Sequence, residues 1–426
     1  MSRFLYSTLL YLLTPLQFLK LWLRGRKLPA YRQRWRERLA LGPKPDAVPR
    51  IWLHAVSVGE TIAAGPLVKA LLERFPDHRL LVTSTTPTGS DQVRRQFGEA
   101  VEHCYFPYDL PGTIKRFLRR YQPDALIVME TELWPNCFFH CHRRGIPIIV
   151  ANARLSPRSF ASYRRFLPLV TPTLRNVDAI AAQSEDDRAR FIALGAPLRQ
   201  VFNSGNIKFD LNLDEDALKA GKTLRQQFGD RPVWIAASTH DGEEAIMLEA
   251  HQQLRERLPD ALLILVPRHP QRFDEVAQLC AGHGMTISRR SEGIYPDEDT
   301  AVYLGDTMGE LMTMFAAADI AFVGGSLNDT GGHNPLEPAS LGLPVLTGPT
   351  IHNFLDIYAS LIDAGNAEVI DNAAALSAGI ERLLKNDNER RRRGEKGRSL
   401  IAASRGATDA ILSLVEKALS SQDTKI

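Results

Sequence analysis

From Arg50 onward the chain alternates short apolar, β-branched runs with segments in which apolar residues recur at helical spacing. Runs that are apolar on both sides and separated by helices indicate parallel sheets covered on both faces. Six runs in each half predict strands: 50–57, 79–85, 101–107, 125–131, 147–153 and 179–184, then 232–238, 261–267, 285–289, 301–306, 320–325 and 344–348.

This alternation predicts an α/β protein with two Rossmann-like, doubly wound parallel-sheet domains that face a cleft. The length of 426 residues suits two domains of about 200 residues each. The polar segment 204–231 is the predicted junction, and 387–420 is predicted to be helical. We therefore divide the chain into a membrane-associated helix with a basic segment, an N-terminal domain and a C-terminal domain that includes the linker and last helices: 1–40, 41–205 and 206–426.

The N-terminal segment 4–23 is apolar and long enough to span a bilayer. Pro15 is expected to interrupt a helix there, and polar residues such as Arg3, Ser7 and Thr14 recur at spacings that gather them on one face. The wide apolar face that remains is typical of a helix lying in the membrane interface. A helix that spans the membrane and a helix packed on its own domain are the alternatives. A cleaved signal peptide is disfavoured, because no small-residue cleavage site follows.

The positive charge of the chain is concentrated in the same region. Residues 1–40 contain nine Lys/Arg and one Glu, a net charge of +8, so the remaining residues carry −5 of the total of +3. A basic head on a mildly acidic body argues against a nucleic-acid partner and indicates a local anionic partner, such as a membrane surface contacted through 1–38. The positive flank predicts that the body lies in the cytoplasm.

Two strand ends in the first half carry candidate catalytic groups. HAVSVGET places Ser57, Gly59 and Glu60 in a tight turn that opens a helix. One interpretation is that the Glu60 carboxylate, in the first turn of a helix, only compensates the helix dipole. The functional interpretation is that Glu60 is a general base that deprotonates a hydroxyl. METELWPN adds Glu130 and Glu132 on one side of an extended chain, and unpaired acids near Glu60 would raise its pKa. Solvated acids at a helix start are the alternative.

The second half carries further candidate motifs at its strand ends: STHDGEE (238–244), VPRHPQRF (266–273), GDTMGELM (305–312) and VGGSLNDTGGHNPLEPA (323–339). The Arg268 guanidinium suits a phosphate, whereas His269 is either a ligand contact or a turn residue. In the last motif the glycines allow close approach by a phosphate or sugar, Asn334 and Pro335 form a helix cap and first-turn pair, and Glu337 can accept hydrogen bonds from a ribose.

Other chemistries lack their motifs. No Walker loop is present and no GxGxxG follows a strand, which disfavours an NTPase or a nicotinamide enzyme. CFFHCH (137–142) has Cys and His at a density seen in metal sites, but it lies inside a predicted helix. The sequence contains no second cluster of candidate ligands that could complete a metal site with it. We therefore predict no metal site and no cofactor.

The motifs VSVGE, METELWPN, VPRHP, GDTMGEL and GGHNPLE, in this order, resemble the 3-deoxy-D-manno-octulosonic acid (Kdo) transferases of lipopolysaccharide synthesis. The resemblance covers nearly the whole chain. It implies an inverting glycosyltransferase of the GT-B fold. It also implies CMP-Kdo as donor, a tetra-acylated lipid A precursor (lipid IVA) as acceptor, and a location on the cytoplasmic face of the inner membrane.

The resemblance also implies roles for residues named above. Glu60 matches the general base of the family. The CMP-binding stretches of the family match Arg268, His269, Gly309, Glu310, Leu311, Asn334, Pro335, Leu336 and Glu337. We assign the remaining strand-end residues to the substrate cleft: Ser57, Gly59, Glu130, Glu132, Ser238 and Thr239. The alternatives are another GT-B glycosyltransferase or sugar epimerase that uses a UDP-sugar, and a non-catalytic membrane scaffold that binds a nucleotide.

Overall fold

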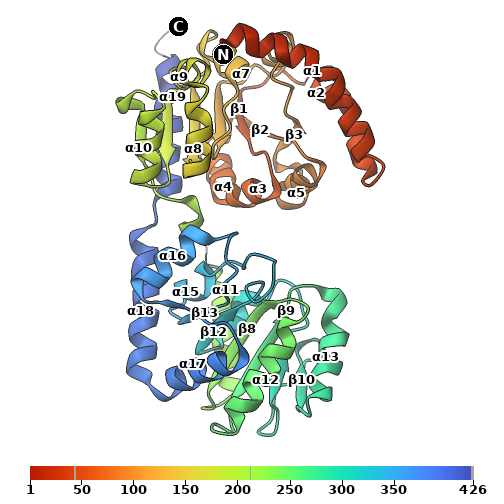
Figure 1. The fold of residues 1–426 in the computed structure, drawn as a ribbon, viewed down its shortest axis with the longest axis vertical. Coiled ribbons are helices and arrows are strands. Elements are labelled where there is room, and N and C mark those ends of the chain that lie inside the picture. The colour runs from red at the N-terminus through yellow and green to blue at the C-terminus, as the bar shows by residue number, and fades with distance from the viewer. Residues whose placement is uncertain (43–44, 212, 424–426) are drawn as a thin grey trace. The chain divides into compact units, whose positions relative to one another are not determined.

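The fold is that of a computed structural model, which describes residues 1–42, 45–211 and 213–423. The chain divides into two compact units (Figure 1): Met1–Asp210 together with Ser404–Ile426, and Leu211–Ala403. Each unit contains one seven-stranded sheet, and every strand pair in the described residues is parallel. The prediction of two doubly wound α/β domains is confirmed.

The sheet of the first unit has the strand order β3-β2-β1-β4-β5-β6-β7. Its strands are buried along most of their length, as expected of a parallel sheet with helices on both faces. They are β1 Arg50–His54, β2 Arg79–Ser84, β3 Glu102–Tyr105, β4 Ala125–Met129, β5 Ile148–Ala153, β6 Ala179–Ala182 and β7 Val201–Asn203.

Helices of the first unit form two apolar cores, one on each face of the sheet. One core packs helices α6, α7, α9 and α10 on the sheet, and the other packs α3, α4, α5 and α19 on it. The helix bounds are α1 Arg3–Arg24, α2 Trp35–Arg38, α3 Val58–Ala63, α4 Gly65–Arg74, α5 Pro87–Phe97, α6 Pro111–Tyr121, α7 Pro135–His142, α8 Pro157–Arg164, α9 Leu167–Leu174, α10 Glu185–Ala193 and α19 Ala407–Asp423.

The sheet of the second unit has the order β10-β11-β9-β8-β12-β13-β14. Its strands are β8 Val233–Thr239, β9 Leu262–Pro267, β10 Ile287–Arg289, β11 Val302–Leu304, β12 Ile320–Val323, β13 Val345–Thr347 and β14 Ala367–Val369. One face is covered by α12, α13 and α17, and the other by α11 and α14. The helices are α11 Glu215–Gln227, α12 Glu243–Arg255, α13 Phe273–Gly282, α14 Leu311–Ala316, α15 Leu336–Ser340, α16 Leu355–Ala364, α17 Ala373–Lys385 and α18 Asp387–Ala403.

All twelve predicted strands are present, but each sheet has a seventh strand that the apolar pattern does not indicate. Both additional strands, β7 and β14, have three residues and lie at a sheet edge. Phe202 and Val369 are exposed there. A short, half-exposed edge strand needs no continuous apolar run, so hydrophobic patterning misses it.

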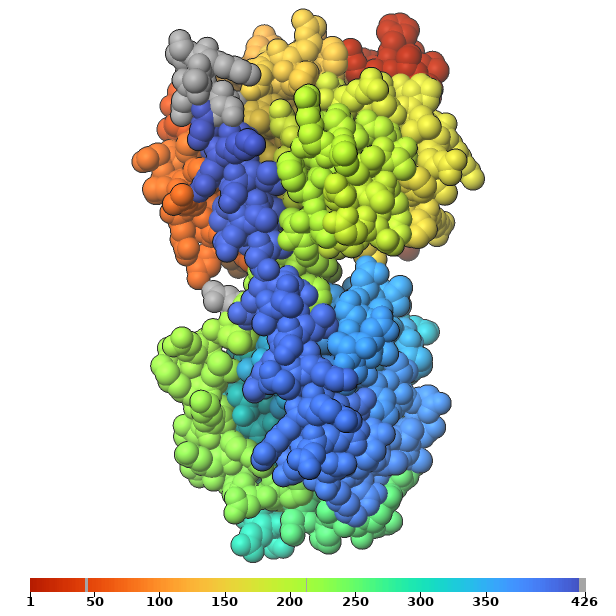
Figure 2. Space-filling view, turned by 90° about the vertical axis from the view of Figure 1, so that its left-hand side faces the viewer, coloured from red at the N-terminus to blue at the C-terminus, as the bar shows by residue number. Residues whose placement is uncertain are grey.

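The C-terminal helix belongs to the first unit, although the sequence division places it in the C-terminal domain. Ala407, Ile411 and Val415 of α19 are buried in the core that contains α4. Figure 2 shows α19, in dark blue, against the orange segment that includes α4. The Asp210 carboxylate accepts hydrogen bonds from the Gly406 and Thr408 N–H groups at 2.7 and 2.6 Å, which ties the helix start to the end of the first unit.

Helix α1 lies along the outside of the first unit and continues through Pro15, which does not interrupt it as expected. Part of its polar face points toward the protein. The Tyr6 hydroxyl donates to Asp109 at 3.0 Å, and Arg3 and Ser7 donate to the Asn136 side chain at 3.2 and 3.1 Å. Large apolar side chains on other faces are exposed: Phe4, Leu5, Leu9, Tyr11, Leu12, Leu16, Leu19, Trp22 and Leu23.

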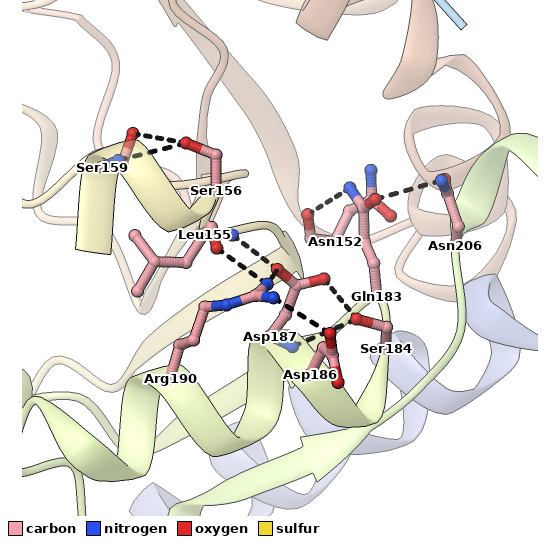
Figure 3. Close-up of polar contacts among 10 residues, drawn as sticks. All are labelled: Asn152, Leu155, Ser156, Ser159, Gln183, Ser184, Asp186, Asp187, Arg190 and Asn206. Atoms are coloured by element: carbon pink, nitrogen blue, oxygen red, sulfur yellow. Dashed lines mark hydrogen bonds and ion pairs between the residues drawn. The ribbon is translucent and has the colours of Figure 1, made fainter. Parts of the chain in front are cut away.

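A network of polar side chains holds the carboxyl ends of β5 and β6 (Figure 3). The Gln183 amide donates to the Asn152 carbonyl at 2.9 Å and accepts from the Asn206 amide at 3.1 Å. Asp187 accepts the Leu155 N–H at 2.8 Å, so α10 fixes the segment that leads into α8. These hydrogen bonds connect the segments that follow β5 and β6 to each other and to α10.

Candidate functional site

The candidate residues of the first unit lie where the strand order of its sheet reverses. The order changes direction between β1 and β4. Glu60 follows β1, and Glu130 and Glu132 follow β4. Ligands of open parallel sheets bind at the carboxyl ends of the strands at such a switch point. The fold therefore gathers the three predicted carboxylates at the position where a ligand of this sheet is expected.

Glu60 is held by the turn in which it lies. Ser57 is the N-cap of α3: its hydroxyl accepts the Glu60 N–H at 3.3 Å and donates to Glu60 Oε1 at 3.1 Å. The Val56 N–H donates to Glu60 Oε2 at 2.8 Å. This is a capping arrangement that fixes the carboxylate.

The pKa of Glu60 is raised to about 7. Burial is the main cause, and the negative charges of Glu130 and Glu132 raise the pKa further, while the hydrogen bonds from Val56 and Ser57 oppose the shift. A carboxyl group with a pKa near neutral is suited to take up a proton at physiological pH.

Glu130 and Glu132 come from a strained strand end. Glu130 has a left-handed backbone with φ of +57°, which is unusual for a residue with a side chain. Its N–H donates to the Ala151 carbonyl at 2.9 Å, and the Tyr163 hydroxyl donates to the Thr131 carbonyl at 3.2 Å. Burial, followed by the charge of Glu130, raises the pKa of Glu132. Strain that the surrounding contacts maintain is common at functional sites.

Gly59 has a different environment from the one expected. It lies in the first helical turn of α3, not in a tight turn, and its φ is not in the left-handed region. A Cβ at this position would meet only the Ser57 hydroxyl, at 3.9 Å. The backbone therefore does not require glycine, and the exposed position is compatible with close approach by a substrate.

The second unit repeats this organisation. Its strand order reverses between β8 and β12. Ser238, near the end of β8, has φ of +57°. The Thr239 side chain is buried, and its hydroxyl has no hydrogen-bond partner among the described residues. The Arg268 N–H donates to the Thr239 carbonyl at 2.9 Å, which joins the ends of β8 and β9. The Arg268 and His269 side chains are exposed at this edge.

Gly309, Glu310 and Leu311 form the start of α14. Gly309 has φ of +84°, and Leu311 is the first helical residue. Arg290 donates to the Glu310 carboxylate at 2.7 and 3.1 Å, and this ion pair lowers the pKa of Glu310. Since its carboxylate is engaged by Arg290, Glu310 could offer a ligand its backbone more readily than its side chain.

Asn334 to Glu337 form a connected turn. The Asn334 side chain accepts the Leu336 N–H at 3.1 Å and donates to Glu337 Oε1 at 3.3 Å. Pro335 occupies the N-cap position of α15, one place later in the chain than the cap that we expected at Asn334. Burial raises the pKa of Glu337. The Asn334 amide thus orients the Glu337 carboxylate, for which the sequence predicts hydrogen bonds to a ribose.

The glycine-rich loop after β12 is held by a residue that the sequence analysis missed. The buried Glu243 carboxylate accepts N–H groups of Gly325, Ser326 and Leu327 at 2.7, 3.0 and 2.9 Å. These donors are therefore engaged within the protein, and close approach of a ligand to the glycines stays a prediction. The signal was present in STHDGEE, where Glu243 follows directly after the β8 turn.

Two histidines at the same strand ends were also missed. His240 and His333 have parallel rings 5.0 Å apart, and their Nε2 atoms form a hydrogen bond of 2.8 Å. Burial lowers the pKa of His333 to about 4. The His269 ring lies 5.2 Å from the His240 ring. These rings connect the loops after β8, β9 and β12.

The cysteines of CFFHCH belong to a core. Cys137 and Cys141 are buried among the apolar side chains of the first unit. In the described part of the chain, no group of three or more His, Cys, Asp or Glu side chains is arranged to hold a metal ion.

Comparison with known proteins places the chain in a family. Residues 33–211 match the family described as 3-deoxy-D-manno-octulosonic-acid transferase (kdotransferase), and residues 230–400 match glycosyl transferases group 1. A 3-deoxy-D-manno-octulosonic acid transferase of Haemophilus influenzae is 44% identical over 420 residues, with 98% of both chains covered. One of Bordetella pertussis is 38% identical over 432 residues, which cover 98% of this chain and 99% of its relative.

The fold also matches solved structures. The UDP-GlcNAc 2-epimerase from Neisseria meningitidis has a TM-score of 0.54 at 15% identity, with 87% of this chain and 100% of that chain covered. At this identity the match supports the two-domain GT-B fold alone. The full-length similarity to the Haemophilus and Bordetella proteins is the finding that identifies the family. The chain belongs to the family of 3-deoxy-D-manno-octulosonic acid (Kdo) transferases and is a glycosyltransferase.

Proposed function

We propose that this glycosyltransferase moves Kdo from CMP-Kdo to a tetra-acylated lipid A precursor, with inversion at the anomeric carbon and with Glu60 as the general base. The observation that carries the proposal is the state of Glu60: a half-buried carboxyl group, oriented by Val56 and Ser57, with a pKa of about 7. The attacking group is a primary hydroxyl of the acceptor, which is a weak nucleophile until its proton is removed.

The reaction balances with one base and one leaving group. The acceptor oxygen forms a bond to the anomeric carbon of Kdo while its proton passes to Glu60. The bond between that carbon and the phosphate oxygen breaks, and CMP leaves with the electron pair. Because attack and departure occur on opposite faces of the carbon, configuration inverts in a single step.

We assign the donor to the second unit. The exposed Arg268 guanidinium has no carboxylate partner among the described residues and can bind the phosphate with two parallel hydrogen bonds. Glu337, oriented by Asn334, can accept hydrogen bonds from the ribose hydroxyls. Fixed donors around the phosphate stabilise the charge that develops as CMP departs.

We further propose that α1 and residues 24–38 hold the enzyme on the cytoplasmic face of the inner membrane. Helix α1 is the one helix in the described residues that is long and apolar enough to cross a membrane. Hydrogen bonds from Arg3, Tyr6 and Ser7 attach its first two turns to the first unit, and further along the helix the Phe18 ring lies 5.4 Å from the Tyr108 ring. Its large apolar side chains on other faces are exposed. This arrangement favours a helix that lies in the interface, with basic residues nearby for anionic headgroups.

The test is a transfer assay with CMP-Kdo and the tetra-acylated precursor, analysed by mass spectrometry. We expect the acceptor mass to rise by one or more Kdo units, and a UDP-sugar offered instead of CMP-Kdo to give no product. The Glu60→Gln variant should bind CMP as the wild type does in a calorimeter but form product far more slowly. A wild-type enzyme that binds CMP and yields no product, or a Glu60→Gln variant of normal rate, would overturn the proposal.

A further inference from the structure

We propose that the pocket between α1 and the rest of the first unit binds the acceptor lipid itself. Arg38 pairs with a phosphate of that lipid, and the apolar wall receives the start of an acyl chain. This inference rests on the proposed function and assigns a subsite within it. It makes α1 part of the acceptor site in addition to a membrane contact.

The pocket has a volume of about 360 Å³. Helix α1 forms one wall, and the segment between β3 and α6 forms much of the other. The lining is largely apolar and aromatic, and includes Leu10, Leu21, Phe106, Tyr108, Leu110 and Trp134. An apolar, preformed pocket with a few polar groups is the usual form of a small-molecule or lipid site.

Arg38 is the polar group that indicates what the pocket binds. Its side chain lines the pocket and the residue is only 5% exposed. Its Nη2 donates to the Thr85 carbonyl at 2.9 Å, and its guanidinium lies 4.1 Å from the centre of the Tyr105 ring. Its Nε atom is buried and has no hydrogen-bond partner among the described residues.

Arg38 also lacks an ion-pair partner within the described part of the chain. The neighbouring Glu37 carboxylate is engaged by Arg34 at 2.7 Å and by the Tyr105 N–H at 3.0 Å. A buried charge without a counter-ion destabilises the folded state. An anionic ligand would supply the missing counter-ion and accept the free Nε–H, and a phosphate suits a guanidinium geometrically.

The position of the pocket favours the acceptor over bulk lipid. Arg38 bonds to Thr85, the Thr85 hydroxyl donates to the Val56 carbonyl at 3.1 Å, and the Val56 N–H donates to Glu60 at 2.8 Å. Val56 and Glu132 themselves line the pocket. A phosphate on Arg38 therefore lies close to the proposed base, as it would if it belonged to the sugar whose hydroxyl attacks.

The experiment compares full-length wild type with Arg38→Gln, using the tetra-acylated precursor and the same lipid with that phosphate removed. We expect Arg38→Gln to raise the KM for the phosphorylated acceptor at least about tenfold, and to leave the KM for CMP-Kdo unchanged. Removal of the phosphate should have the same effect on the wild type and little further effect on the variant. This non-additivity is the signature of a direct contact.

Because Arg38 is buried, its replacement could disturb folding. A second pair of variants therefore tests the pocket and leaves Arg38 in place. Leu10→Trp fills the pocket from α1 and should also raise the acceptor KM, whereas Leu198→Trp, at an exposed leucine of the first unit that lies outside both α1 and the pocket, should not. Equal effects of the two tryptophans, or an acceptor KM within twofold of wild type in folded Arg38→Gln, overturn the inference.

Two further measurements separate the possible sources of phosphate. Inorganic phosphate and phosphatidylglycerol vesicles are each added as competitors of the acceptor. A soluble phosphorylated fragment of the acceptor is the reference competitor. If phosphate or the vesicles inhibit the wild-type enzyme as strongly as this fragment does, and do not inhibit Arg38→Gln, the pocket binds that source of phosphate and the acceptor assignment is wrong. If wild type transfers no Kdo at all, the proposed function fails first; normal transfer with unaltered variants rejects the subsite alone.

Discussion

The Glu243 carboxylate accepts the Gly325 N–H at 2.7 Å, although 82 residues separate the two in the chain. The same carboxylate accepts the N–H groups of Ser326, Leu327 and His240. Glu243 thereby holds the loops after β8 and β12 together at the switch point of the second sheet. We infer that it is a positioning residue: the N–H groups that a glycine-rich loop commonly offers to a phosphate are used here to fix the shape of the proposed donor site.

Replacement of Glu243 by Gln should destabilise the second unit by about 2–4 kcal/mol, because one acceptor oxygen becomes an amide that faces buried N–H donors. We also expect a raised KM for CMP-Kdo with a smaller change in the KM for the acceptor. Urea unfolding and steady-state kinetics check both parts. Glu249→Gln, on the exposed face of α12, is the matched control. A stable Glu243→Gln enzyme with normal donor KM would contradict the positioning role.

Glu60→Gln should lower kcat by about 10²–10⁴ while both KM values stay near those of wild type, because only the proton acceptor is lost. In the wild type, kcat/KM should fall as the pH drops below about 7, since the base works only when it is deprotonated and its pKa is raised to about 7. A pH–rate profile checks this. A profile that stays flat from pH about 8 down to about 5 would show that another group takes the proton.

The pH–rate profile of Glu132→Gln tests what raises the pKa of Glu60. The negative charge of Glu132 helps to raise that pKa, so its removal should move the acidic limb of the profile to lower pH. The shift should be small, because burial is the main cause of the raised pKa. A limb that moves to higher pH is the result that contradicts this electrostatic account.

Much of this arrangement could be predicted from sequence because buried parallel strands leave an unambiguous apolar pattern. All twelve predicted strands exist, and four of the motifs at their ends fall at the switch points of the two sheets: HAVSVGET, METELWPN, STHDGEE and VGGSLNDTGGHNPLEPA. The pattern could not assign the last helix to a unit. The apolar positions of α19 show that it is buried but not against which sheet, and the contact of Asp210 with the start of α19 is a long-range one.

The residues that sequence reasoning missed share one physical property: their role depends on partners far away in the chain. Glu243 looks like a helix-start carboxylate, Arg38 like one more member of a basic segment, and Asp109 like a loop residue. In the structure Glu243 binds a distant loop, Arg38 is buried and has no counter-ion among the described residues, and Asp109 anchors α1. The sequence shows the charge and spacing of these residues, whereas their roles depend on burial and on long-range contacts that only the structure shows.

Asp109 should make the stability of the first unit depend on pH. It is buried and its pKa is raised to about 7, mainly by burial, although the Asn136 and Cys137 N–H groups and the Tyr6 hydroxyl bind it. Between pH about 4 and about 7 the folded state holds a proton that the unfolded state has lost, so the contribution of Asp109 to stability falls as pH rises through this window and is constant above it.

The measurement for Asp109 is urea unfolding of wild type and Asp109→Asn at a series of pH values. The difference between the two proteins should change by about 4 kcal/mol across the window and stay level above pH about 7. Tyr6→Phe is the control for the anchor itself: it removes one hydrogen bond and should loosen α1, with faster amide exchange in that helix. A pH-independent difference between wild type and Asp109→Asn contradicts the raised pKa.

The exposed face of α1 should determine how strongly the enzyme binds membranes. Leu12 and Leu16 are 70% and 58% exposed, so burying each in lipid should contribute roughly 1.5–3 kcal/mol. Leu12→Glu should therefore weaken binding to anionic vesicles by about tenfold or more, and Leu12→Glu with Leu16→Glu should weaken it further. Leu198→Glu, a change at a 63% exposed leucine on another part of the first unit, should have no such effect.

Cosedimentation with vesicles at low and high salt measures both contributions, since salt screens the basic segment but not the apolar face. Unchanged binding of the double variant at low salt, with binding of both proteins lost at high salt, would mean that α1 does not enter the lipid and that charge alone holds the enzyme on the surface.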